Sequence, residues 1–205
     1  GLAHVVKIAE PFIGDENFIF YLGDNILVGG IRKFIDKFES NGSNCHLVLS
    51  KVSDPERFGV PEIEGDKIIG VEEKPTKPKS SFAVTGIYLY DSSIFEAVNN
   101  IKPSARGELE ITDLNRVYLE QDSLHVELMG RGIAWLDTGT HESLLEAANF
   151  IEIIQRRQGL KISCPEEIAY KLGYIDAAQV EAIATGLKQN EYGKYLLKML
   201  NDEVY

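Results

Sequence analysis

Apolar positions in the first half of the chain fall into two alternating patterns. Residues 2–12 and 31–38 repeat apolar side chains at helical spacing and predict two amphipathic helices. The runs 18–22 and 45–52 are apolar on both faces, which is typical of strands buried inside a helix-covered parallel sheet. This alternation of helices and strands predicts an α/β sheet wound in the right-handed sense.

The middle of the chain changes to shorter apolar segments. Residues 59–71 predict two short strands around a turn at Gly65 and Asp66. Residues 74–81, with two prolines and three lysines, predict a polar loop. Further strands are expected over 83–90, 124–129 and 133–136, and helices over 94–100 and 108–121.

From Thr140 onward the pattern is helical, and helices are expected over 141–158, 165–172, 176–187 and 191–200. The predicted fold class is α/β. Residues 1–140 would form a Rossmann-like core with a mixed, mainly parallel sheet flanked by helices, and residues 141–205 a helical C-terminal appendage packed on that core. The apolar residues of the last predicted helix indicate that it docks on the domain or on a neighbouring subunit.

The composition argues against several classes of function. The 205 residues carry a formal net charge of −11, and so acidic a protein repels nucleic-acid backbones and anionic membranes. No apolar run reaches membrane-spanning length, so a cytoplasmic location is expected. The two cysteines, Cys45 and Cys164, are too few for a disulfide framework and are expected to be reduced and buried or semi-buried. The four histidines lack partners at metal-ligand spacing, which argues against a zinc site and a nucleophilic triad.

Two aspartates follow predicted strands and are candidate metal ligands. Asp24 comes after the run 18–22, and Asp137 after the run 133–136. Ligands of open α/β sheets bind outside the carboxyl ends of the strands, and two carboxylates on one crevice suit Mg²⁺ that is shared with substrate phosphates. The alternative is that each Asp caps a helix or a turn.

Two basic residues are candidates for a phosphate site. Lys74 stands at a predicted strand exit, where it could neutralise a phosphate or simply belong to a solvated charge cluster. Arg106, with Gly107 and Glu108, opens the predicted helix 108–121, whose free N–H groups would attract an anion. The alternative is a helix start whose acids suit the helix dipole.

Eight short motifs carry a family resemblance over essentially the whole chain. They are, in order, Gly1-Leu2-Ala3, Leu22-Gly23-Asp24-Asn25, Asp54-Pro55-Glu56-Arg57-Phe58-Gly59-Val60, Glu72-Glu73-Lys74-Pro75, Ala83-Val84-Thr85-Gly86-Ile87-Tyr88, Arg106-Gly107-Glu108-Leu109-Glu110-Ile111-Thr112-Asp113, Trp135-Leu136-Asp137-Thr138-Gly139-Thr140 and Cys164-Pro165-Glu166-Glu167-Ile168-Ala169-Tyr170. Together they resemble the sugar-1-phosphate nucleotidylyltransferases, and among these the bacterial and archaeal glucose-1-phosphate thymidylyltransferases.

The resemblance implies a reaction. A phosphate oxygen of glucose 1-phosphate would attack the α-phosphorus of dTTP in line, with Mg²⁺ as cofactor, giving dTDP-glucose and pyrophosphate without a covalent enzyme intermediate. The product would serve the synthesis of dTDP-deoxysugars, such as dTDP-rhamnose, for surface polysaccharide. Two alternatives stay open: the same chemistry with UTP, and a non-catalytic sugar-nucleotide-binding or interaction module.

The resemblance also implies residue roles. Four residues would carry the chemistry, namely Asp24 and Asp137 as Mg²⁺ ligands and Lys74 and Arg106 on the sugar phosphate. Seven more would contact substrates, namely Glu73 with Gly59 and Val84 at the sugar hydroxyls, Tyr88 and Trp135 along the pocket wall, and Gly1 and Leu2 beside the nucleotide base.

Two departures from the family pattern matter. The family opens with a glycine-rich turn bearing an Arg, followed by a Lys, and both grip the triphosphate. This opening is absent from the 205 residues, so we expect this chain alone to be inactive and poorly stable. The family precedent is also a homotetramer, with a second site between subunits for a downstream sugar nucleotide. Five residues match that site, although Val28 replaces its usual aromatic: Gly29, Arg131, Ser163, Glu167 and Ile168.

Overall fold

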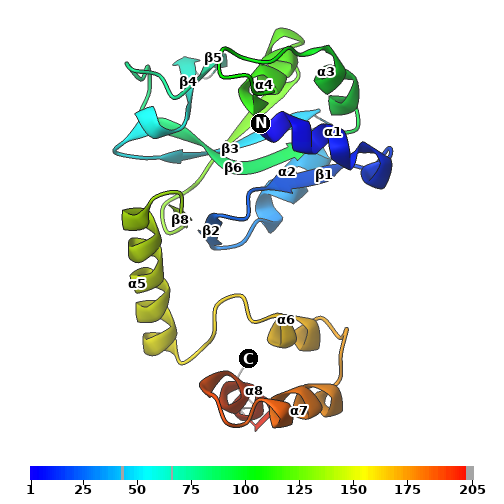
Figure 1. Cartoon of the computed structure of the whole chain (residues 1–205), viewed down its shortest axis with the longest axis vertical. Helices are drawn as coiled ribbons and strands as arrows, with labels where there is room; N and C mark the ends of the chain where they lie inside the picture. Colours follow the sequence, from blue (N-terminus) through cyan, green and yellow to red (C-terminus); the bar gives the residue numbers. More distant parts are fainter. Residues whose placement is uncertain (43, 66, 202–205) are drawn as a thin grey trace. The chain divides into compact units, whose positions relative to one another are not determined.

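The computed structural model of the chain describes residues 1–42, 44–65 and 67–201. The chain divides into two compact units, Gly1–Gly139 and Thr140–Tyr205. The first unit contains a six-stranded sheet, with helices against it (Figure 1). Its strands are β1 (Phe18–Tyr21), β3 (Cys45–Lys51), β4 (Gly59–Glu64), β5 (Lys67–Glu73), β6 (Phe82–Tyr90) and β7 (Leu124–Leu128).

The order of strands in this sheet is β5-β4-β6-β3-β7, and β1 also pairs with β6. The expectation of a mixed α/β sheet flanked by helices is confirmed. The sheet is not mainly parallel, however, since β3 with β7 is the one parallel pair among the described strands. Strand β6 lies between β1 and β3 and runs antiparallel to both. The two apolar runs that suggested neighbouring parallel strands are therefore separated by a third.

Alternate side chains of β6 enter two different cores. Tyr88 and Tyr90 pack with α1 (Leu2–Ile13), α3 (Ile94–Asn100) and α4 (Ile111–Glu120), while Ile87 and Leu89 pack with α2 (Arg32–Asn41). Because successive residues of a strand point to opposite faces, these helices cover the two faces of the sheet. Burial on both faces explains why the strand reads as a continuous apolar run.

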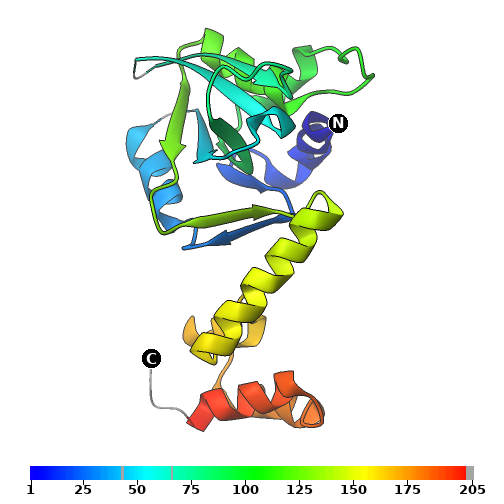
Figure 2. The ribbon, with the colours of Figure 1, turned by 90° about the vertical axis from the view of Figure 1, so that its left-hand side faces the viewer.

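A second, two-stranded sheet accompanies the α2 face. It pairs β2 (Asn25–Val28) with β8 (Ala134–Asp137) in antiparallel register, and Figure 2 shows the two strands side by side. The sequence pattern predicts β8 but not β2, because Gly23, Asp24 and Asn25 are typical of a break after the preceding strand. The chain instead turns at these residues and continues directly into a new strand.

Helix α4 begins at Ile111, three residues after the predicted start at Glu108. Gly107 has a left-handed φ of 75°, and Glu110 is extended and caps the helix. The backbone oxygen of Leu109 accepts a hydrogen bond from the N–H of Ala3, at the start of α1. Leu109 therefore contacts α1 through its backbone, while Gly107 and Glu108 exchange backbone hydrogen bonds with Ser104.

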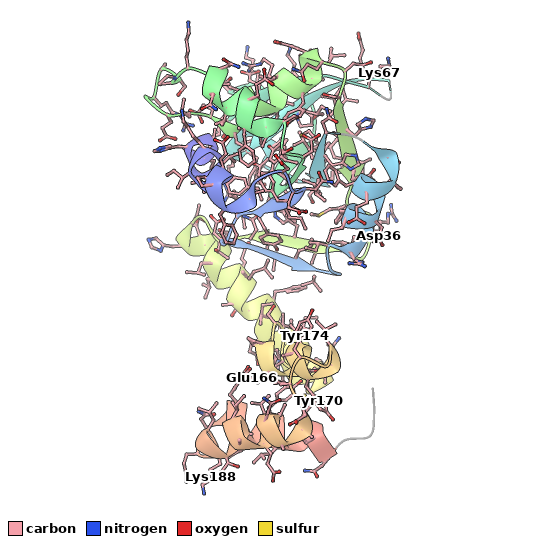
Figure 3. The ribbon with its side chains drawn as sticks, turned by 90° about the vertical axis from the view of Figure 1, so that its right-hand side faces the viewer. Asp36, Lys67, Glu166, Tyr170, Tyr174 and Lys188 are labelled. Carbon is pink, nitrogen blue, oxygen red and sulfur yellow. The ribbon has the colours of Figure 1, made fainter. Side chains whose placement is uncertain are left out.

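As far as residue 201, the second unit contains four helices close to the predicted bounds: α5 (His141–Gln158), α6 (Pro165–Lys171), α7 (Ala177–Gly186) and α8 (Glu191–Asn201). Its core is formed by Cys164, Val180, Ala184 and Leu196. Tyr192 and Tyr195 of α8 donate hydrogen bonds to Glu166 and Glu167 of α6. Figure 3 labels Glu166 and Tyr170 on α6 and Tyr174 just beyond it. Nowhere in the described part of the chain does a helix combine the length and apolar character needed to cross a bilayer.

Candidate active site

The β2–β8 sheet brings the two predicted metal ligands to the same place. Asp24 immediately precedes β2, and Asp137 ends β8 directly opposite Asn25. The backbone N–H and the hydroxyl of Thr138 both donate to the backbone oxygen of Asp24, each at 2.9 Å. The two aspartates therefore meet through an antiparallel ladder, and not along the carboxyl ends of parallel strands as the sequence argument supposed.

Asn25 links Asp24 to Trp135, which is predicted to line the pocket. Its side-chain nitrogen donates to Asp24 Oδ1 at 2.8 Å, and its side-chain oxygen accepts from the indole N–H of Trp135 at 2.6 Å. Asn25 is buried and lies against Gly86 of β6, where a Cβ would come within 2.5 Å of the amide nitrogen. The sequence does not single out Asn25 as a site residue, because its amide is not ionisable. The one available signal is that Asn25 stands within the same motif as Asp24.

Arg57 is a second residue that sequence reasoning missed. It ends the short 3₁₀ helix Pro55–Arg57, and its guanidinium contacts Asp137 Oδ2 at 2.8 Å and Asp54 Oδ2 at 2.7 Å. These contacts, first of all the hydrogen bond to Asp54, raise the pKa of Arg57. Its motif, residues 54–60, contributes to the family resemblance, but the resemblance implies a substrate contact in it only for Gly59.

The proposed sugar-binding residues form a second cluster around Glu73, at the end of β5. Thr112 of α4 donates to Glu73 Oε2 at 2.7 Å. Gly59 pairs with both Glu73 and Val84 in the sheet, and a Cβ on Gly59 would meet their side chains at 3.4 and 3.6 Å. A side chain at this position would therefore occupy the space beside the Glu73 carboxylate.

Tyr88 connects the two clusters. It is 5% exposed, and burial is the main reason that its pKa is raised. The carboxylates of Glu73 and Asp24 raise this pKa further, so both charges lie within electrostatic range of one phenol. The predicted sugar-binding residue and the predicted metal ligand thus belong to one neighbourhood of the first unit.

The two predicted phosphate-binding cations differ in their surroundings. Lys74 follows Glu73 directly, has an exposed side chain, and is held at a left-handed φ of 45° by an N–H···O bond to Phe58 of 2.9 Å. Arg106 forms a two-pronged ion pair with Glu110, at 3.0 and 2.9 Å. Its pKa is raised mainly by that hydrogen bonding, and Glu73 contributes, so Arg106 also lies near the Glu73 cluster.

The anion-binding interpretation of the Arg106 segment needs correction. Arg106 does not open α4, whose N-cap is Glu110. The carboxylate of Glu110 accepts hydrogen bonds from Ser104 and Arg106. Burial alone would raise the pKa of Glu110, but these bonds outweigh it and lower the pKa. The anion at this position is thus a side chain of the protein itself.

Gly1 and Leu2 lie beside this segment. Gly1 caps α1, and a Cβ on it would collide with the backbone oxygen of Leu109. Leu2 is about one third exposed. Both residues therefore sit next to the loop that carries Arg106.

The carboxylate pair fits a divalent metal of the Mg²⁺ type. Within the described residues no three His, Cys, Asp or Glu side chains gather as a metal cage. Mg²⁺ does not require one, since it usually takes one or two protein carboxylates and completes its shell with water and substrate phosphate. Asp24 and Asp137 would supply that donor set, and each accepts a hydrogen bond from a neighbouring nitrogen, of Asn25 or Arg57.

A cavity of about 350 Å³ is bounded by β4, β5 and α4. It is lined by Val60, Glu72 and Arg116 among others, and none of Gly59, Glu73 and Lys74 lines it. The candidate site is therefore not this cavity.

The five residues matched to a regulatory site divide between the two units. Gly29, with a φ of 120°, and the exposed Arg131 belong to the first unit. Ser163, Glu167 and Ile168 belong to the second. The carboxylate of Glu167 is buried and accepts hydrogen bonds from Lys171 and Tyr195, so it stabilises the helical unit. Effector binding by these residues stays a prediction.

Comparison with known proteins identifies the family of the chain. The sequence pattern of the nucleotidyl transferase family matches residues 1–153. The chain belongs to this family. The glucose-1-phosphate thymidylyltransferase of Xanthomonas campestris pv. campestris is 51% identical over 198 residues, which cover 96% of this chain and 67% of that protein. The enzyme of the same name from Neisseria meningitidis is 48% identical over 204 residues, covering 98% and 70%.

The nucleotidyl transferase fold is also found among solved structures. A Bacillus anthracis structure assigned as a glucose-1-phosphate thymidylyltransferase, in complex with sucrose, is 47% identical to this chain with a TM-score of 0.68. The match covers 73% of this chain and 60% of that one. The chain thus spans about two thirds of the length of the nucleotidyl transferases it resembles.

Proposed function

We propose that this nucleotidyl transferase moves a thymidylyl group from dTTP to glucose 1-phosphate, forming dTDP-glucose and pyrophosphate. The observation that carries the proposal is the meeting of Asp24 and Asp137 through the β2–β8 sheet, beside the Glu73 cluster. The named relatives at 51% and 48% identity favour this substrate pair.

The described residues would supply the metal ligands and the sugar-phosphate contacts of an in-line transfer. Transfer of a nucleotidyl group depends on positioning and charge neutralisation, so a nucleophilic side chain is not required. Lys74 and Arg106 would bind the phosphate of the sugar, and the Glu73 carboxylate would accept hydrogen bonds from sugar hydroxyls. Arg106 must exchange part of its ion pair with Glu110 for the substrate phosphate.

Asp24 and Asp137 would hold Mg²⁺, which when bound neutralises charge on the nucleotide phosphates. The two carboxylates would otherwise repel these phosphates, so the protein needs the cation at this position. A homotetramer, a cytoplasmic location and a place in dTDP-deoxysugar synthesis belong to the same proposal and rest on the family resemblance.

The proposal is tested by turnover in a chimera in which residues 1–205 replace the matching segment of the Xanthomonas relative. Release of pyrophosphate is measured with glucose 1-phosphate and either dTTP or UTP. We expect turnover with dTTP, and a loss of about 100-fold or more in kcat/KM for Asp24→Asn and for Asp137→Asn, because each removes one metal-binding charge.

The matched control is Asp36→Asn, on the exposed face of α2; Figure 3 labels Asp36. Asp36 pairs with Arg32 at 3.2 Å. This variant should keep the turnover of the unsubstituted chimera. A chimera that folds but uses only UTP, or an Asp137→Asn variant with full activity, would refute the proposed reaction.

A further inference from the structure

Arg57 stands between two aspartates, and only one of them belongs to the candidate site. One guanidinium nitrogen is 2.7 Å from Asp54, three residues earlier in the chain, and the other is 2.8 Å from Asp137, eighty residues later. We infer that Arg57 is a positioning residue that fixes the carboxylate of Asp137 for its metal ion, and that Asp54 in turn fixes Arg57. The inference rests on the proposed function, since it concerns the metal site of that reaction.

The surroundings of Arg57 hold it more firmly than an ordinary surface ion pair. Its guanidinium lies 5.1 Å from the centre of the Phe58 ring, and Phe58 packs edge-on against Trp135 at 5.2 Å. The side chain of Arg57 is only 35% exposed. A planar guanidinium that contacts two carboxylates and an aromatic ring has few alternative orientations, so it can set the direction of the groups it binds.

The contacts on Asp137 leave one of its oxygens available. Arg57 and the backbone N–H of Gly139, at 3.4 Å, both approach Oδ2. Among the described residues no hydrogen bond or ion pair is formed with Oδ1, which leaves this oxygen available to a metal ion. Hydrogen bonds of this kind orient ligating carboxylates in metalloproteins, and their removal typically costs 10- to 100-fold in metal affinity or activity.

The charge balance favours a positioning role over competition with the metal. Two aspartates and one arginine carry a net charge of about −1, so Asp54 offsets the positive charge that would otherwise repel a cation from Asp137. If Arg57 instead occupied the place of the metal ion, removing its charge would strengthen metal binding. The two roles thus predict opposite changes in affinity.

Mn²⁺ binding to the chain provides the test. Trp135 is the one tryptophan of the sequence, and its indole N–H donates to Asn25, next to Asp24. Paramagnetic broadening of this single indole resonance in a Mn²⁺ titration therefore reports on the candidate site. We expect Arg57→Gln to weaken Mn²⁺ binding about 10-fold. Asp54→Asn should weaken it less, and Arg57→Lys should fall between Arg57→Gln and the unsubstituted chain.

Arg116→Gln is the matched control. Arg116 pairs with Asp113 at 2.8 Å with the same spacing along the chain as Arg57 and Asp54, but it has no contact with Asp137 among the described residues. This variant should bind Mn²⁺ like the unsubstituted chain. Circular dichroism of every variant shows whether it is folded, and the conservative Arg57→Lys variant supplies the measurement if Arg57→Gln does not fold.

Tighter or unchanged Mn²⁺ binding in folded Arg57→Gln would overturn the inference, as would the absence of binding near Trp135 in the unsubstituted chain. Failure of the proposed reaction would be detected by a different measurement, the pyrophosphate assay on the chimera. In that case Mn²⁺ binding responds to Arg57 as described, while the chimera releases no pyrophosphate from dTTP.

Discussion

At the level of single side chains, Asn25 links Asp24 with Trp135 in the candidate site. It is buried, it orients Asp24, and it accepts the indole N–H of Trp135. Its amide fits because Gly86 of β6 leaves the space of a Cβ free beneath it. The close approach of Asn25 to β6 therefore depends on a glycine in the middle of a strand, a position where glycine otherwise weakens a sheet.

Replacing this glycine should disturb the site without touching an ionisable group. In Gly86→Ala the new Cβ would come within 2.5 Å of Asn25 Nδ2 and 2.9 Å of Leu22 Cβ. We expect a loss of about 1–3 kcal/mol in the free energy of unfolding, as for other overpacked interiors, together with a shift of Trp135 fluorescence. Both are measured in a urea titration.

The control is Gly23→Ala, where a Cβ would meet no atom within 4 Å. It should change neither the free energy of unfolding nor the fluorescence by a comparable amount. Equal effects of the two substitutions would show that Asn25 is not held against Gly86 in this way.

The acidic and basic residues of the site could be selected from the sequence, whereas their partners could not. Asp24 and Asp137 follow strands, and a carboxylate after a strand is a recognisable pattern. Arg57 appears in the sequence as one charge in a polar segment, and its contact with Asp137 spans 80 residues. Only the pairing of β2 with β8 and the course of residues 54–58 bring these groups together, and neither follows from local patterns.

At the level of elements, the two last helices approach each other through a glycine. Gly193 of α8 is buried, and a Cβ on it would overlap the carbonyl group of Leu187, just after α7. A helix normally gains about 1 kcal/mol when an internal glycine becomes alanine. Here the neighbour is backbone, which cannot rotate away as a side chain can, so the steric cost should exceed that gain.

Two glycine substitutions in this unit should therefore change the free energy of unfolding in opposite directions. We expect Gly193→Ala to destabilise the protein by about 1–3 kcal/mol, because α8 must move away from α7. Gly186→Ala, at the last residue of α7 with no atom within 4 Å of a new Cβ, should stabilise it by up to about 1 kcal/mol. Thermal unfolding shows whether each variant is stabilised or destabilised. Stabilisation by Gly193→Ala would exclude the close packing of α7 and α8.

Element type followed from the sequence more reliably than element pairing. The four C-terminal helices lie close to their predicted bounds because apolar periodicity and separating glycines are local signals. Strand direction was misjudged, since an apolar run records burial on both faces and not the direction of the neighbour. The predicted start of α4 is too early because residues 108–110 have helix-forming side chains, but the backbone oxygens of Glu108 and Leu109 accept hydrogen bonds from Ser104 and Ala3. The predicted turn at Gly65 and Asp66 is described only at Gly65, since Asp66 lies outside the described residues.

At the level of the whole molecule, each compact unit has its own core and one of the two cysteines. Cys45 is fully buried in the core that α1, α3 and α4 share with the sheet, and Cys164 is 2% exposed in the core of the helical unit. Burial raises the pKa of the Cys45 thiol well above its usual range, so it reacts only when its surroundings open. The two thiols can therefore report on the opening of the two units separately.

Thiol labelling should separate the stabilities of the two units. With a thiol-specific reagent and mass spectrometry of peptides, we expect slow labelling of both cysteines without denaturant, because both are buried. Gly193→Ala should accelerate labelling of Cys164 by about 10-fold for each 1.4 kcal/mol lost and leave Cys45 almost unchanged, and Gly86→Ala should do the reverse. The reason is that each substitution loosens packing within one unit and its core. Equal acceleration at both cysteines in either variant would show that the chain opens as one cooperative structure and that the two cores do not act as separate folding units.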